Sequence, residues 1–209
     1  MIYLWPGAGL NGTDTPDYFG IMARPSDESV ALGIKAGRRW ACDNEAFTRG
    51  FEPDRFFLFL DKLKPWRDTC LFIVCPDVVG DAWQTLWLYS EWADRCRQFG
   101  PVAFVAQDGQ EGIEFPFIFD WLFIGGTTEW KMSPAADSCI QRAKRMGKPV
   151  HVGRVNSIKR ILHFAQMGVD SVDGTFPCFE PDAAKKRLPK GLLQPALFRR
   201  VVPDSDCGG

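Results

Sequence analysis

Three apolar runs in the sequence each end on a carboxylate. They are Trp40 to Cys42 before Asp43, Leu71 to Pro76 before Asp77, and Val169 to Val172 before Asp173. Short runs of this kind are typical of parallel strands that are buried on both faces. The carboxyl ends of such strands converge, so acids spread over about 130 residues would meet at one mouth. Unpaired carboxylates in a cleft are costly, and their presence therefore indicates a function.

Short apolar runs alternate with longer amphipathic segments along the chain, which is the pattern of repeated strand and helix units. We expect strands near Ile2–Trp5, Arg39–Cys42, Leu71–Cys75, Val102–Ala106, Trp121–Ile124, Val150–Val152 and Ser171–Val172. We expect helices from Pro53 to Leu63, Asp81 to Gln98, about Ser133 to Met146, and Asn156 or Ser157 to Met167.

These elements predict an α/β fold, a (β/α)8-type TIM barrel of compact or irregular form. Leu197–Val202 is the only candidate for an eighth strand. The alternative is an open, doubly wound sheet. The barrel is favoured because polar residues follow nearly every strand, instead of gathering at one switch point. We expect residues 1–180 to form a catalytic barrel domain and residues 181–209 to form a basic C-terminal extension or tail.

The composition suits one domain, since the chain has 209 residues and is 45% hydrophobic. Its net charge of −1 gives no global attraction to nucleic acid or to an anionic membrane, so a polyanion would need a local basic patch. Seven scattered cysteines predict reduced thiols and a cytoplasmic protein. No run approaches membrane-spanning length, so no membrane partner is expected. No cysteine belongs to a C-x-x-C pair, and no metal site is expected.

The strand ends of such a barrel carry side chains that could bind a polar heterocycle. They are Asp43, Asp77, Gln107 with Asp108, Gly125-Gly126, His151 with Arg154, and Asp173. Carboxylates and an amide can bind ring N–H and C=O groups, and paired glycines let the backbone approach a flat ligand. A further acid could attack an electron-poor carbon. A carboxylate nucleophile suits glycosyl transfer through a covalent ester at the anomeric carbon.

The order of these motifs resembles the queuine/archaeosine tRNA-guanine transglycosylase family. From His151 to Pro177 the chain has a Val-Gly strand end, a helix and a strand that stops at Asp173, which the resemblance implies is the nucleophile. The family's Asp-Ser-Gly-Gly-Phe motif, whose aspartate does acid/base work, resembles Asp43 to Phe47. Its base-reading aspartate matches Asp77, its Gly-Ile-Gln-Gln-Gly turn resembles Val105 to Gly109, and its Val-Gly-Gly-Leu turn resembles Ile124 to Thr127.

Two departures from the family pattern affect the expected substrate. Asn44-Glu45 replaces Ser-Gly, which puts a bulky acid beside the site. The zinc-binding segment, which belongs to the tRNA-binding part of the family, is expected to be lacking. Compact relatives encoded by phages and modification clusters, which exchange guanine in DNA for a 7-deazaguanine, resemble the chain better. DNA is therefore favoured over tRNA, and no cofactor is expected because transglycosylation needs none.

Several single residues also have structural interpretations. Asp43 could cap the following helix, and Asp170 is better explained as a packing or turn acid than as the nucleophile. His151 could contact ligand or be a satisfied core histidine, and Phe47 could stack on a base or belong to the core. Trp130 could cover a flat ring or seal the barrel rim.

We therefore expect a guanine transglycosylase, a pentosyltransferase that exchanges bases. Asp173 attacks the anomeric carbon and Asp43 manages protons. The substrate site comprises Asp77, Gln107, Gly125, Gly126, His151 and Phe47. A duplex would have to release the target nucleotide from its stack. Phosphates would meet Arg154, Lys131 and the basic residues Lys185, Lys186 and Arg187. The protein would work in the cytoplasm, that of the host if it is phage-encoded. A homodimer or a partner subunit that adds nucleic-acid-binding surface stays open.

Two other functions stay open. One is a barrel enzyme for a free nucleoside or a phosphorylated metabolite, with Lys131 the lysine to test for a Schiff base. The other is a non-catalytic base-binding protein that keeps the pocket and lacks turnover.

Overall fold

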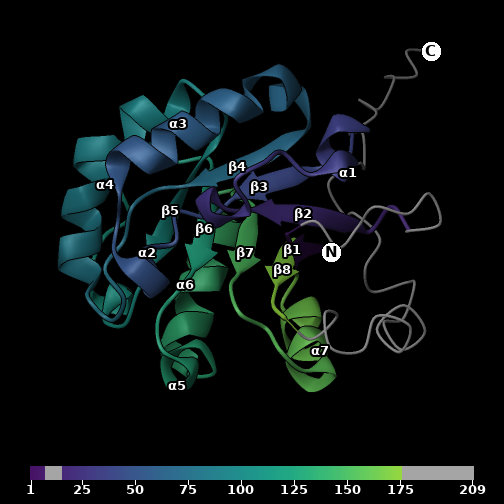
Figure 1. Ribbon diagram of the computed structural model, residues 1–209. Helices are drawn as coiled ribbons and strands as arrows, with labels where there is room; N and C mark the ends of the chain where they lie inside the picture. The colour runs from purple at the N-terminus through teal and green to yellow at the C-terminus, as the bar shows by residue number, and fades with distance from the viewer. Residues whose placement is uncertain (8–15, 176–209) are drawn as a thin grey trace, which may run out of the picture.

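Eight parallel strands close into a barrel in the computed structural model, which describes residues 1–7 and 16–175 (Figure 1). The strands are β1 (Ile2–Pro6), β2 (Phe19–Ala23), β3 (Trp40–Cys42), β4 (Cys70–Val74), β5 (Val102–Ala106), β6 (Trp121–Ile124), β7 (Val150–Val152) and β8 (Ser171–Asp173). Each strand pairs with its neighbours in chain order, and β8 pairs with β1. The expected α/β barrel is confirmed, and an open doubly wound sheet is excluded.

The strand β2 is the one that the sequence pattern does not predict. Its Gly20 lies so close to β1 and β3 that an added Cβ would come within 2.7 Å of the Leu4 side chain and 2.8 Å of the Arg39 carbonyl oxygen. A glycine inside a strand often marks such a close approach. The barrel closes through β2, so Leu197–Val202 is not the strand that completes it. That segment lies outside the described residues, as does the whole expected C-terminal extension, residues 181–209.

Helices surround the barrel and cover its outer face (Figure 1). The α-helices are α1 (Leu32–Lys35), α2 (Ala46–Arg49), α3 (Pro53–Leu63), α4 (Ala82–Arg97), α5 (Thr128–Lys131), α6 (Pro134–Arg145) and α7 (Ile158–Gln166). The short 3₁₀ turns are η1 (Pro25–Asp27), η2 (Lys64–Thr69) and η3 (Gln110–Gly112). Asp81 and Ser157 cap α4 and α7, because each side chain accepts a first-turn backbone N–H.

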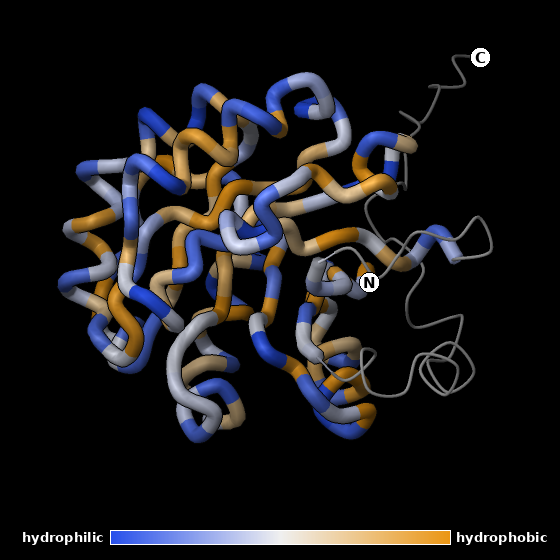
Figure 2. Tube along the Cα trace, in the orientation of Figure 1, coloured by the Kyte–Doolittle hydropathy of each residue, from blue (hydrophilic) through white to orange (hydrophobic). Residues whose placement is uncertain are grey.

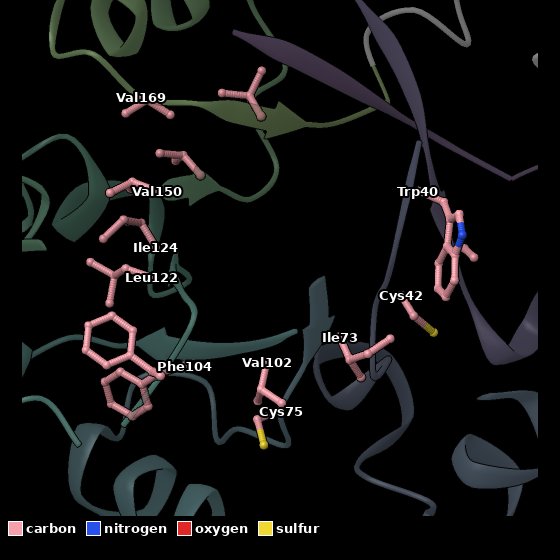
Figure 3. Packing of buried hydrophobic residues seen from close by; sticks show 14 of the residues in the cluster. Trp40, Cys42, Ile73, Cys75, Val102, Phe104, Leu122, Ile124, Val150 and Val169 are labelled. Atoms are coloured by element: carbon pink, nitrogen blue, oxygen red, sulfur yellow. The ribbon is translucent and has the colours of Figure 1, made fainter. Parts of the chain in front are cut away.

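The alternation of side chains along each strand builds two cores. Outward residues such as Phe104, Leu122, Ile124 and Val150 pack between the strands and the helices, as Figure 3 shows. Inward residues form a separate cluster inside the barrel: Ile2, Leu4, Met22, Ala41, Phe72, Val74, Ala103, Val105 and Trp121. Hydrophobic and hydrophilic residues alternate along the helices (Figure 2), and the buried ones, such as Phe56 and Leu60 of α3, belong to the outer core. A filled interior leaves only the mouth of the barrel for a ligand.

The five cysteines in the described part of the chain, Cys42, Cys70, Cys75, Cys96 and Cys139, are free thiols. Most of them are buried in the outer core, where they pack as small apolar side chains. Within residues 1–7 and 16–175, every helix is too short or too polar to cross a membrane.

Candidate active site

The inward alternation of the strands delivers the predicted site residues to the barrel mouth. Ala41 on β3, Val105 on β5 and Phe123 on β6 point into the barrel interior. Two positions further along the chain, directly after the ends of these strands, come Asp43, Gln107 and Gly125. The same period places Asp173 two residues above the buried Ser171 of β8. Acids that are far apart in sequence therefore share one mouth, as the sequence predicted.

Asp77 is held from both sides by side-chain amides. Its Oδ1 accepts an N–H from Asn44 at 2.8 Å, and its Oδ2 accepts one from Gln107 at 2.6 Å. Burial raises the pKa of Asp77 to about 6, against the opposing effects of the two amides and of Arg154. The carboxyl is thus fixed in orientation and is able to change its charge near neutral pH.

The other end of Gln107 is also occupied. Its Oε1 accepts the backbone N–H groups of Gly126 at 2.8 Å and of Gly80 at 3.1 Å. The side chain is buried, and it ties the loop after β4 to the loop after β6. Gln107 therefore acts in this structure as a support for Asp77 and for the glycine turn, and its direct contact with a base stays a prediction.

Asp43 lies next to the other two acids, and its pKa is raised further than that of Asp77. Burial raises its pKa to about 7, and the negative charges of Asp173 and Asp77 add to the effect. Its Oδ1 accepts the Glu45 backbone N–H at 3.3 Å. Glu45, not Asp43, is the N-cap residue of α2, so the helix-cap interpretation of Asp43 is not supported. A carboxyl that titrates near neutral pH is suited to general acid/base work.

Asp173 ends β8 and is largely buried, with 15% of its side chain exposed. Its Oδ1 accepts the Arg154 backbone N–H at 2.5 Å, and the Nε2 atom of His151 lies 3.5 Å from the same oxygen. Asp170 lies at the opposite end of β8, where its carboxylate bonds to Lys144 and to the Val150 backbone N–H. This placement agrees with the expected packing role of Asp170.

Phe47 and Arg154 meet across the mouth. The guanidinium carbon of Arg154 lies 3.9 Å from the centre of the Phe47 ring, and its Nη2 donates to the Gly126 carbonyl oxygen at 2.8 Å. The Phe47 side chain is 63% exposed, so the core interpretation of this residue is wrong. Below the pair lies a hollow of about 50 Å³, which is bounded by Asp43, Asn44, Asp77, Gln107, Gly125 and Gly126 among others. Ligand sites usually have about 300–1,000 Å³, so Phe47 and Arg154 would have to separate to admit a purine.

The paired glycines fit the turn above β6 for steric reasons. A Cβ on Gly125 would come within 2.8 Å of Gln107 Nε2, and one on Gly126 would come within 2.5 Å of the Trp130 ring. Gly126 also has a φ of +62°, which disfavours residues with a side chain. The buried Trp130 packs beneath this turn and donates to Glu111 at 2.9 Å, which agrees with its interpretation as a seal of the rim.

The residues predicted to bind phosphates are placed differently from one another. Arg154 lies at the mouth, whereas Lys131 is only 4% exposed and donates to the Gly153 carbonyl oxygen at 2.8 Å. Burial lowers the pKa of Lys131 to about 8. This burial corrects the prediction that Lys131 meets phosphates at the surface. Lys185, Lys186 and Arg187 lie outside the described residues.

Sequence reasoning missed the role of Asn44, which is buried and donates to the Cys75 carbonyl oxygen as well as to Asp77. Its position directly after Asp43 is the sequence feature that could have indicated this role. The neighbouring Glu45 has a left-handed backbone (φ +58°), and its carboxylate accepts the Ser26 N–H and pairs with Arg55. The bulky acid that departs from the family pattern therefore has partners of its own in η1 and α3.

Larger hollows elsewhere do not have this chemistry. Two hollows of about 550 Å³ lie on the outer face of α4, and they are lined mainly by aromatic and aliphatic side chains such as Trp83, Trp87 and Phe117. No group of three or more metal-binding side chains occurs within residues 1–7 and 16–175.

No protein-family model and no curated protein sequence matches the chain.

Proposed function

We propose that the protein is a guanine transglycosylase, which exchanges a guanine in nucleic acid for a 7-deazaguanine through a covalent aspartyl-sugar intermediate. The observation that supports it best is the meeting of Asp43, Asp77 and Asp173 at one mouth in three different environments. Neighbouring carboxyls with different environments can take separate roles as acid, binder and nucleophile. The resemblance to the transglycosylase family assigns the same roles to the same positions.

In the first half of the reaction, a carboxylate oxygen of Asp173 attacks C1′ of the sugar. The C1′–N9 bond breaks and its electron pair leaves with the guanine, which takes a proton from the Asp43 carboxyl. The raised pKa of Asp43, about 7, keeps this proton available near neutral pH. In the second half, the incoming base returns its N9 proton to Asp43 and attacks C1′, which releases Asp173.

The base site would use Asp77 as its acceptor. A carboxylate that is fixed by two amides can accept the ring N–H and the amino group of a guanine edge together. The Gly125-Gly126 turn leaves room for a flat ring beside the backbone, and Phe47 offers an exposed aromatic face. His151 is too deeply buried for direct contact with the base, so we propose a different role for it below.

The polymer would be DNA in preference to tRNA, with the target nucleotide turned out of its stack. Arg154 is the described residue best placed to meet a phosphate, together with the predicted run Lys185, Lys186 and Arg187. The proposed enzyme is of the (β/α)8 type, lacks the family's zinc segment and needs no cofactor. It would work in the cytoplasm. A homodimer or a partner subunit would add nucleic-acid-binding surface.

A second function has one observation in its favour. The lowered pKa of Lys131 is a property of lysines that form Schiff bases, as in an aldolase-like lyase for a phosphorylated metabolite. Its burial and its bond to Gly153 count against contact with a substrate in this conformation. A non-catalytic base-binding protein would have the same pocket without the covalent step.

The test supplies labelled guanine with duplex DNA, single-stranded DNA or tRNA. We expect label to enter DNA with the wild-type protein and none with Asp173→Ala. The variant should still bind free guanine, and denaturing electrophoresis should show a protein–DNA adduct for the wild type alone. If no polymer gains label, the transglycosylase proposal fails. Unchanged exchange by Asp173→Ala would contradict the assigned nucleophile.

A further inference from the structure

His151 lies one layer below the proposed nucleophile, inside the barrel. It points inward from β7, is fully buried and packs between the rings of Phe72 and Phe123, whose centres lie 5.1 and 4.6 Å from its own. Its Nδ1 is 2.8 Å from the Ser171 hydroxyl oxygen. Its Nε2 has no hydrogen-bond partner within bonding distance in the described part of the chain, and it faces Asp173 Oδ1 at 3.5 Å.

The surroundings decide which nitrogen of His151 carries the proton. Burial lowers the pKa of this histidine, so the ring is neutral and has a single N–H. A proton on Nδ1 would leave the lone pair of Nε2 facing the Asp173 carboxylate in a dry interior, where two acceptors repel each other. A proton on Nε2 points at the carboxylate instead, and the Ser171 hydroxyl then donates to Nδ1. Only this second arrangement satisfies the three groups.

We propose that Ser171 and His151 form a buried relay that orients Asp173, holding its Oδ1 and leaving Oδ2 as the atom that attacks the sugar. The proposal rests on the function proposed above. Oδ1 already accepts the Arg154 backbone N–H, and the His151 N–H is its second donor. Oδ2 has no partner among residues 1–7 and 16–175. Two donors on one oxygen fix the rotation of the carboxylate about its Cβ–Cγ bond.

The relay has the same three residue types as the catalytic triad of a serine hydrolase, but here the carboxylate, not the serine, is the reacting group. Ser171 is fully buried at the lower end, so it cannot reach a substrate, and the carboxylate lies at the mouth. His151 is accordingly a positioning residue. The 3.5 Å separation is longer than a hydrogen bond, and we expect it to shorten when the sugar pulls Asp173 into the reactive position. Small misplacements of a reacting group can cost about 100-fold in rate.

The first test does not depend on activity. The chain has only two histidines, His151 and His163, so the imidazole ¹⁵N signals of labelled protein can be assigned with a His163→Gln variant. We expect the Nε2–H tautomer for His151, and we expect the Nε2 signal to move in Asp173→Ala. An Nδ1–H tautomer would overturn the proposal, as would an Nε2 chemical shift that is the same in the wild type and in Asp173→Ala.

The second test compares variants that keep or lose a donor at the Nε2 position. The amide nitrogen of Gln in His151→Gln lies near that position, whereas Asn in His151→Asn is too short. His151→Phe keeps a flat ring between Phe72 and Phe123 without any donor. We expect kcat for exchange to fall about 100-fold in His151→Phe and His151→Asn with little change in KM, and to recover in large part in His151→Gln. Thermal unfolding of each variant reports folding separately.

The outcomes separate the two proposals. Equal loss in His151→Gln and His151→Asn, or a change in KM alone, would contradict the relay while the transglycosylase function stands. If the wild type exchanges no base in any polymer, the function fails. The tautomer measurement then decides by itself whether His151 holds Asp173.

Discussion

Gln107 donates its side-chain amide to Asp77 across 2.6 Å while its carbonyl oxygen accepts two backbone N–H groups from neighbouring loops. The orientation of the amide is therefore fixed, with oxygen toward Gly126 and nitrogen toward the acid. This donor joins Asn44 and Arg154 in lowering the pKa of Asp77 against the effect of burial.

Replacing Gln107 by Glu tests that dependence. The donor is lost and a second carboxyl faces Asp77 at short range, so the pKa of Asp77 should rise further above its present value of about 6. If Asp77 binds guanine as a carboxylate, affinity at pH 7 should fall, and it should recover as the pH rises. Calorimetric titration with guanine between about pH 6 and 9 measures this. Gln98→Glu, at the end of α4, is the control and should leave the affinity unchanged.

Asp43→Asn should abolish base exchange and raise the stability of the folded protein by an amount that depends on pH. The folded-state pKa of Asp43 is raised from 3.8 to about 7, so the folded protein binds more protons than the unfolded chain between these values. The stability contributed by the protonated form is full below about pH 4 and is lost as the pH rises through 7. The Asn side chain of the variant has no charge to bury and keeps an acceptor for the Glu45 N–H.

We therefore expect Asp43→Asn to unfold several degrees above the wild type at about pH 8, with the gap closing toward about pH 4. Thermal unfolding at a series of pH values tests this, and the variant should have lost base exchange. A constant gap at all pH values would mean that burial of the charge is not the cause.

The glycine turn offers a matched set of alanine substitutions. Gly126→Ala combines a positive φ with a Cβ only 2.5 Å from the Trp130 ring, and it should destabilise the protein by about 1–3 kcal/mol. Gly125→Ala should displace Gln107 and weaken guanine binding more than it lowers stability. Gly112→Ala has open space around its Cβ and should be neutral. Chemical denaturation and guanine titration of the three variants separate these effects.

Phe47→Ala should affect binding without affecting folding. The Phe47 ring is largely exposed, and its main described contact is with the Arg154 guanidinium. Exposed substitutions usually change stability by less than about 0.5 kcal/mol, whereas loss of a stacking face weakens base binding by about 1–3 kcal/mol. We expect an unchanged melting temperature and a Kd for guanine that rises about tenfold or more. Tighter binding by the variant would show that Phe47 acts only as a cover.

The sequence predicted most of the barrel because its strands are apolar and end at polar residues. Asp43, Asp77 and Asp173 could be assigned to one mouth by this pattern alone, since parallel strands place their ends together. The strand β2 was missed because Phe19 to Ala23 contains a glycine, a residue that is more typical of turns than of strands. Only the packing against Leu4 and Arg39 explains that glycine.

The partners of the site residues were beyond sequence reasoning. Lys131 follows a strand end in sequence, and nothing in its neighbours indicates that its ammonium turns inward to Gly153, 22 residues away. The same holds for His151, whose role depends on Ser171 and Asp173 in the adjacent strand. Contacts between strands fix these orientations, and the local sequence does not encode them separately.

The pairing of β8 with β1 places Asp173 beside Leu4, across almost the whole length of the described chain. A contact of such long sequence separation forms late in folding, because its loop-closure entropy must be overcome first. The carboxylate of Asp173 thus comes into position only when the sheet becomes a ring. Partly folded molecules would have Asp43, Asp77 and Asp173 at separate places, so the proposed reaction would have to wait for the ring to close.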